Sequence, residues 1–123
     1  MKADKNYPHD LEERLFGFVV STIRFLRTLD NSPEVSVIRY QLIKSSTSAG
    51  ANYEEAQAGS SRKDFGNKSN ISLKEMRESN YWLRLMAALE IGEHQKLHPL
   101  VQESKELKLI LGAIVKKINK PEN

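Results

Sequence analysis

The chain has 123 residues, the length of one domain, and its 39% apolar residues are enough for one hydrophobic core. It contains no cysteine, which excludes a disulfide scaffold, a thiol nucleophile and a zinc site built on thiolates. The net charge of +3, from 19 Lys and Arg against 16 Asp and Glu, is compatible with nucleic-acid binding without requiring it.

The apolar runs of the chain are short. None approaches the about 20 residues that a membrane-spanning helix needs. Residues 1–10 are polar and mixed in charge, without the apolar core of a signal peptide. We therefore expect a cytoplasmic protein that does not cross a membrane.

The first predicted helix covers residues 10–28. Asp10 and Glu13 fit a capping arrangement in which a carboxylate accepts free backbone N–H groups. Apolar residues then recur at alternating spacings of four and three, the period of a helix and not of a strand. Phe16, Val20 and Ile23 lie outside that seam, and a small bundle cannot bury every apolar face. We expect these three residues in an interface between subunits.

The second predicted helix covers residues 33–58. Ser32 is a favourable N-cap, and Pro33 suits the first helical position because its missing N–H has no intrahelical partner there. Gly59 is a plausible stop. The seam of this helix is aliphatic in the first half and small and polar in the second half.

The third and fourth predicted helices cover residues 62–91 and 99–119. Ser61 and Asp64 form a second cap signal, and Pro99 is expected to open the last helix after a linker. Four amphipathic helices joined by short loops predict an all-α fold, a left-handed, up-down-up-down antiparallel four-helix bundle. This bundle accounts for the whole chain, residues 1–123, as a single domain.

Polar side chains replace aliphatic ones along one face of the second and third predicted helices. If the two faces meet, these groups must bond one another, because an unpaired buried polar group costs about 1–3 kcal/mol. We interpret them as a structural network that fixes helix register, and a ligand-binding or catalytic site in the same seam is the alternative. The network consists of Ser45, Ser48, Asn52, Glu55, Ser72, Glu75 and Ser79.

No residue pattern predicts catalysis. The chain lacks the G-x-S-x-G turn of serine hydrolases, and its histidines are far from the serine cluster in sequence. Glu90, His94 and His98 follow one another at spacings of four, but Gly92 and Pro99 bracket the histidines and predict a loop. We assign no catalytic residue, cofactor, metal site or small-molecule substrate, and we expect no enzymatic activity.

The third predicted helix is rich in cations. Residues 62–84 contain six Lys and Arg against three carboxylates, with Tyr81 available for base stacking. Such a face can bind RNA by releasing counterions from phosphates, and an ordinary solvated helix face is the alternative. The candidate nucleic-acid contacts are Arg62, Lys63, Lys74, Arg77 and Arg84.

The middle of the chain resembles the family of 23S rRNA-intervening sequence proteins. The resemblance rests on the run QLIKSSTSAGANYEEA at residues 41–56, followed by SSRKDF at 60–65, LKE at 73–75 and ESNYWL at 78–83. It implies a left-handed four-helix bundle that assembles with copies of itself, since homopentamers are known in the family, and no established enzyme activity. The family's link to ribosomal RNA comes from where its genes lie, so RNA binding is an expectation.

The resemblance also marks single positions in this chain. They are Ser48, Asn52, Glu55, Lys74, Glu75, Glu78, Tyr81 and Trp82. Tyr81 and Trp82 join the first-helix residues as candidates for the subunit interface. A similar fold serves as an accessory subunit of reverse transcriptases, which is an alternative role. Gly66 departs from the usual aliphatic residue, which would loosen the start of the third helix, and Ser79 replaces a common Thr.

Overall fold

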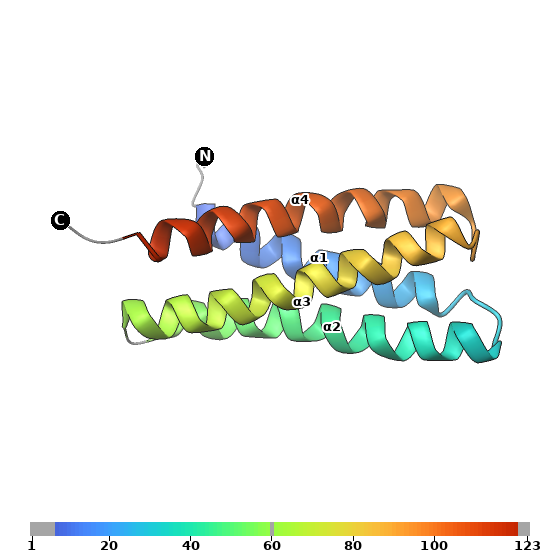
Figure 1. Ribbon diagram of the computed structural model, residues 1–123, viewed down its shortest axis with the longest axis horizontal. Coiled ribbons are helices and arrows are strands. Elements are labelled where there is room, and N and C mark those ends of the chain that lie inside the picture. The colour runs from blue at the N-terminus through green and yellow to red at the C-terminus, as the bar shows by residue number, and fades with distance from the viewer. Residues whose placement is uncertain (1–6, 60, 121–123) are drawn as a thin grey trace.

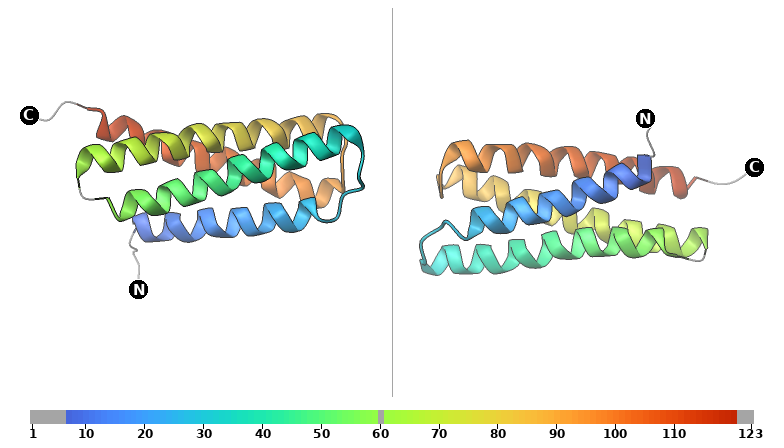
Figure 2. Two further views of the ribbon diagram at one scale, coloured as in Figure 1. Left: turned by 90° about the horizontal axis from the view of Figure 1, so that it is seen from below. Right: turned by 180° about the vertical axis from the view of Figure 1, so that it is seen from behind.

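The computed structural model describes residues 7–59 and 61–120, which form four helices and, within those ranges, no strand. The helices are α1 (Tyr7–Leu26), α2 (Pro33–Gln57), α3 (Arg62–Ala88) and α4 (His94–Ile118). Each helix packs against the next, and α4 returns to contact α1, so the four surround a common core (Figures 1 and 2). The predicted all-α four-helix bundle is confirmed, and its left-handed sense stays a prediction.

Short local signals fix where α2 and α3 begin. Ser32 Oγ accepts a hydrogen bond from the Val35 backbone N–H at 3.3 Å, and Pro33 occupies the first helical position. Ser61 Oγ accepts from the Asp64 N–H at 3.0 Å. Each cap occupies one of the backbone donors that a helix start leaves free, which is worth about 1 kcal/mol.

The beginning of α4 differs from the prediction. The helix begins at His94 and not at Pro99, because the backbone N–H groups of Lys96 and Leu97 already bond the Glu93 carbonyl. Pro99 lies in the second turn with its ring exposed, so it removes one backbone hydrogen bond without ending the helix. The predicted linker at 93–98 is therefore mostly helix.

The other predicted boundaries shift by smaller amounts. α1 begins at Tyr7, which places Asp10 in the first turn, where its charge favours the helix dipole, and not at the cap. α3 ends at Ala88, and the turn that follows contains Gly92 with a φ of +78°. A Cβ on Gly92 would lie 2.6 Å from Cζ of Phe25, so both the backbone angle and the packing require glycine there.

All four helices contribute apolar side chains to one core. Each of its large, fully buried side chains contributes about 1.5–3 kcal/mol relative to exposure. Among them are Leu15 of α1, Leu42 of α2, Met76 and Leu83 of α3, and Leu107 and Leu111 of α4. No helix in the described residues is long and apolar enough to span a membrane.

Small residues allow close approach at two helix crossings. A Cβ on Gly50 of α2 would already touch Val19 of α1 at 3.4 Å. A Cβ on Gly66 of α3 would lie 3.0 Å from Cγ2 of Ile118 at the end of α4. Gly66 therefore accommodates Ile118, and α3 begins at Arg62 as predicted.

Candidate nucleic-acid interface

Serine side chains form the buried centre of the α2–α3 contact. Ser45 Oγ and Ser79 Oγ lie 2.8 Å apart, and Ser79 Oγ also donates to the Glu75 carbonyl at 3.0 Å. Ser72 Oγ donates to the Ala49 carbonyl on the opposite helix at 2.7 Å. The three serines are at most 1% exposed. Their hydroxyls join α2 to α3, and we call these three residues the serine seam.

Other members predicted for the network lie outside the serine seam. Asn52 Nδ2 donates to the Ser48 carbonyl at 2.9 Å and to Ser48 Oγ at 3.1 Å, so this half-buried pair bonds within α2. Glu55 is exposed and pairs with Lys68 at 2.9 Å, which corrects its expected place in the interior. Ten residues at about 100° each rotate Glu55 by about 80° from Ser45, which takes it from the buried centre of the α2–α3 contact to its exposed edge, where it meets Lys68 of α3.

Glu75 lies half-buried beside the seam on α3. Burial raises the pKa of its carboxyl, the nearby Glu78 raises it further, and Lys44 of α2 opposes both effects. Glu78 accepts a hydrogen bond from Trp82 Nε1 at 3.0 Å. These family-marked residues thus form local contacts on α3 and do not converge on one reactive group.

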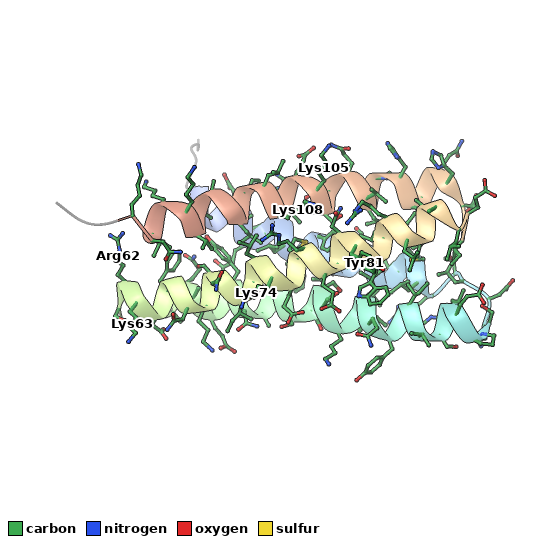
Figure 3. All side chains as sticks on the ribbon, in the orientation of Figure 1. Arg62, Lys63, Lys74, Tyr81, Lys105 and Lys108 are labelled. Carbon is green, nitrogen blue, oxygen red and sulfur yellow. The ribbon has the colours of Figure 1, made fainter. Side chains whose placement is uncertain are left out.

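The five candidate nucleic-acid contacts divide into two groups. Arg62 and Lys63 lie at one end of the bundle, where Arg62 Nη2 donates to the Ile118 carbonyl at 2.7 Å (Figure 3). This bond caps the end of α4 and ties Arg62 to the fold. Lys74, Arg77 and Arg84 lie farther along α3, with exposed side chains.

The structure adds two lysines of α4 that the sequence analysis missed. Lys105 and Lys108 both belong to α4, and Figure 3 shows them on the same side of the molecule as Lys74 and Tyr81 of α3. Burial lowers the pKa of Lys108, and the nearby positive charges lower it further, in the order Arg84, Arg77 and Lys105. We call these four residues, Arg77, Arg84, Lys105 and Lys108, the α3–α4 basic surface.

Asn80 lies at the centre of this surface and is 1% exposed. Its Oδ1 accepts from Arg84 Nε at 2.9 Å and from Lys108 Nζ at 3.1 Å. Its Nδ2 donates to Ser104 Oγ of α4 at 2.9 Å. A neutral side chain therefore gathers cations from two helices. Within residues 7–59 and 61–120, no carboxylate forms an ion pair with any member of the basic surface.

An aromatic side chain borders the basic surface. Tyr81 is 49% exposed and packs edge-on against Trp82, with ring centroids 5.0 Å apart. The guanidinium carbon of Arg84 lies 5.9 Å from the centroid of the Tyr81 ring. Cations beside an exposed aromatic ring are a combination that single-stranded nucleic acids bind.

The candidate interface residues fall on two faces. Phe16 of α1 is 69% exposed, and Val20 and Ile23 on the same helix are half-buried. Tyr81 and Trp82 belong to α3, whose backbone does not lie directly against that of α1 in the described parts of the chain. Of these five residues, Phe16 has the most exposed side chain.

The histidines of α4 form no metal cluster with other residues that the structure describes. His94 and His98 stack with ring centroids 5.4 Å apart on the first turns of α4, where the sequence analysis predicted a loop. Across the residues that the structure describes, no three side chains of metal-ligating type gather in one place.

Comparisons with known proteins agree with this fold. The chain resembles a crystallised protein of unknown function from the S23 ribosomal protein family of Bacteroides thetaiotaomicron VPI-5482. The two are 33% identical, the match covers 89% of this chain and 97% of that one, and the TM-score is 0.78. No functionally curated protein matches the chain. The sequence pattern of the 23S rRNA-intervening sequence proteins matches residues 10–113, and the chain belongs to that family.

Proposed function

We propose that this protein is a non-enzymatic, homo-oligomeric helical bundle that binds RNA on the α3–α4 basic surface. The observation that carries the proposal is the convergence of Arg84 and Lys108 on Asn80, with Arg77 and Lys105 close by. Four cations that share no carboxylate repel one another, and polyanion binding relieves that repulsion. Lys74 lies along the same side of α3 and extends the positive surface (Figure 3).

Salt-dependent binding tests the RNA proposal. Anisotropy of a labelled single-stranded oligouridine should show binding at low salt that weakens steeply between about 50 and 200 mM salt. The slope of log affinity against log salt is about −0.7 for each phosphate that one subunit neutralises. Absence of binding at the lowest salt would overturn the proposal, and so would a salt-independent affinity.

Self-association is the second part of the proposal. The Phe16 side chain is 69% exposed, which lowers the solubility of a free monomer. Burial of this side chain against a second copy would stabilise the assembly. We expect a ring, as the resemblance implies, with a mass near five times the 14.0 kDa of one chain. Light scattering measures that mass, and a single-chain mass at micromolar concentration would contradict the proposal.

A matched pair of variants locates the interface. Phe16→Ser should lower the oligomer mass, because it removes apolar area from the α1 face. Val37→Ser on α2, 59% exposed but outside the proposed interface, should leave the mass unchanged. Equal masses for both variants and the wild type would exclude Phe16 from the interface.

The two alternative functions make different demands. A catalytic or ligand site in the predicted polar network would need free polar groups, whereas the three hydroxyls of the serine seam are already hydrogen-bonded and Glu55 pairs with Lys68. We therefore expect no catalytic turnover, and no ligand-induced shift in melting temperature, that Glu55→Gln would abolish. An accessory role beside a reverse transcriptase would use the same basic surface. A reverse-transcriptase gene next to the coding sequence would favour that role, and ribosomal RNA flanks would favour the other context.

A further inference from the structure

We propose that Arg84 and Lys108, held by Asn80, bind a single phosphate of the RNA backbone while Tyr81 stacks on a neighbouring base, so that single-stranded RNA is preferred over duplex. The inference rests on the proposed RNA binding, and it specifies single-stranded RNA as the ligand.

The orientation of the Asn80 amide is fixed by its surroundings. Ser104 Oγ donates to the Val101 carbonyl at 2.9 Å, so it must accept from Asn80 Nδ2. The carbonyl end of the amide then faces Arg84 and Lys108. Oδ1 takes one N–H from each cation, and no other residue that the structure describes bonds the two terminal nitrogens of the Arg84 guanidinium or the other two protons of Lys108, which can therefore meet an incoming anion.

The neutrality of Asn80 is the second argument. An aspartate at this position would have nearly the same shape and would form ion pairs with both cations, but it would lose the donor that the Asn80 amide offers to Ser104 Oγ. Asparagine positions the same two side chains and neutralises neither. The lowered pKa of Lys108 is in keeping with this excess of positive charge, which a phosphate oxygen can compensate.

Tyr81 is the residue that would distinguish single-stranded RNA from duplex RNA. It directly follows Asn80 on α3, and its ring is half-exposed between Trp82 and Arg84. Bases in a duplex are stacked on one another and hide their faces, whereas an unpaired base can stack on an aromatic ring. A phosphate bound at Asn80 would therefore place the adjacent nucleotide beside Tyr81.

The experiment compares variants of the full chain by anisotropy on single-stranded oligouridine and on a duplex of equal length. Asn80→Asp retains the shape of the side chain and neutralises a charge. It should weaken single-strand binding by about tenfold or more, the equivalent of one lost charged contact. Lys108→Gln should weaken binding similarly and decides the matter if Asn80→Asp fails to fold. Lys117→Gln, an exposed lysine on the opposite side of α4, is the matched control and should bind as the wild type does.

Two further variants test the stacking. Tyr81→Ala should lower single-strand affinity at least about fivefold and leave duplex affinity unchanged, whereas Tyr81→Phe should bind as the wild type does. Equal wild-type affinity for single strand and duplex would overturn the preference.

The failure of this inference is distinguishable from failure of the proposed function. If Arg77→Gln weakens binding while Asn80→Asp and Lys108→Gln do not, the surface binds RNA but has no phosphate site at Asn80. If the wild type binds neither probe at low salt, both proposals fall.

Discussion

Two adjacent residues on α3, Ser79 and Asn80, centre two different helix contacts. Ser79 faces α2, and its hydroxyl is hydrogen-bonded to the hydroxyl of Ser45 and to the Glu75 carbonyl. The pair therefore contains no charge and both of its hydroxyls are bonded. Asn80 faces α4 and is equally buried, yet it holds Arg84 and Lys108 at its carbonyl oxygen. The hydroxyls of the serine seam bond one another and backbone carbonyls, whereas no carboxylate among the described residues pairs with the cations at Asn80. Burial of a polar side chain alone therefore does not tell a structural contact from a binding site.

The largest expected effect concerns RNA affinity. Replacing both Arg77 and Lys105 by Gln removes two cations without touching Asn80, so RNA affinity at low salt should fall by about tenfold to a hundredfold. The slope of log affinity against log salt should become shallower by about 0.7 for each lost contact. Thermal unfolding should show equal or higher stability, since like charges are removed from around Lys108. A clear loss of stability would mean that these cations serve the fold.

The next effect should appear in stability and spare RNA binding. Ser79→Leu forces a larger side chain into a fully buried position between α2 and α3, and overpacking of this kind costs about 1–3 kcal/mol. Urea unfolding measures the loss, and anisotropy should show the wild-type RNA affinity. If Ser79→Leu is tolerated without cost, the seam is loosely packed and does not fix helix register.

A smaller effect isolates the hydrogen bond itself. Ser79→Ala removes the partner of Ser45 Oγ, which can still donate to the Leu42 carbonyl at 3.3 Å. The free energy of unfolding should therefore fall by only about 0.5–1.5 kcal/mol. As a control, Thr47→Ala on the exposed side of α2 should change it less. An equal loss for the two variants would show that the seam bond contributes nothing special.

The smallest effect concerns pH. Because the pKa of Glu75 is raised in the folded protein, its stabilising contribution is complete below the unfolded value near 4.5 and is lost as pH rises through the folded value. Glu75→Gln should therefore be as stable as the wild type in acid and slightly more stable at neutral pH. Melting temperatures across this range check the sign, and a neutral-pH loss in the variant would show that the carboxylate makes a favourable contact.

The sequence predicted most of the fold because the relevant signals are local. Ser32, Pro33 and Ser61 mark helix starts through contacts within one turn, and the seam spacing identifies the buried faces. The same reasoning placed Phe16 on the surface, because it lies outside the apolar seam. It failed at Pro99, since whether a proline opens a helix depends on upstream hydrogen bonds to the Glu93 carbonyl.

The sequence by itself determined the helices, their apolar and polar faces and the cations of α3, because each follows from spacing along one segment. Only the tertiary structure decided which polar residues meet. The rotation of α2 carries Glu55 out of the interior, and the packing of α4 on α3 brings Lys108 to Asn80. The contact between Asn80 and Lys108 joins residues 28 positions apart, and the relative rotation of two helices depends on the packing of the whole core.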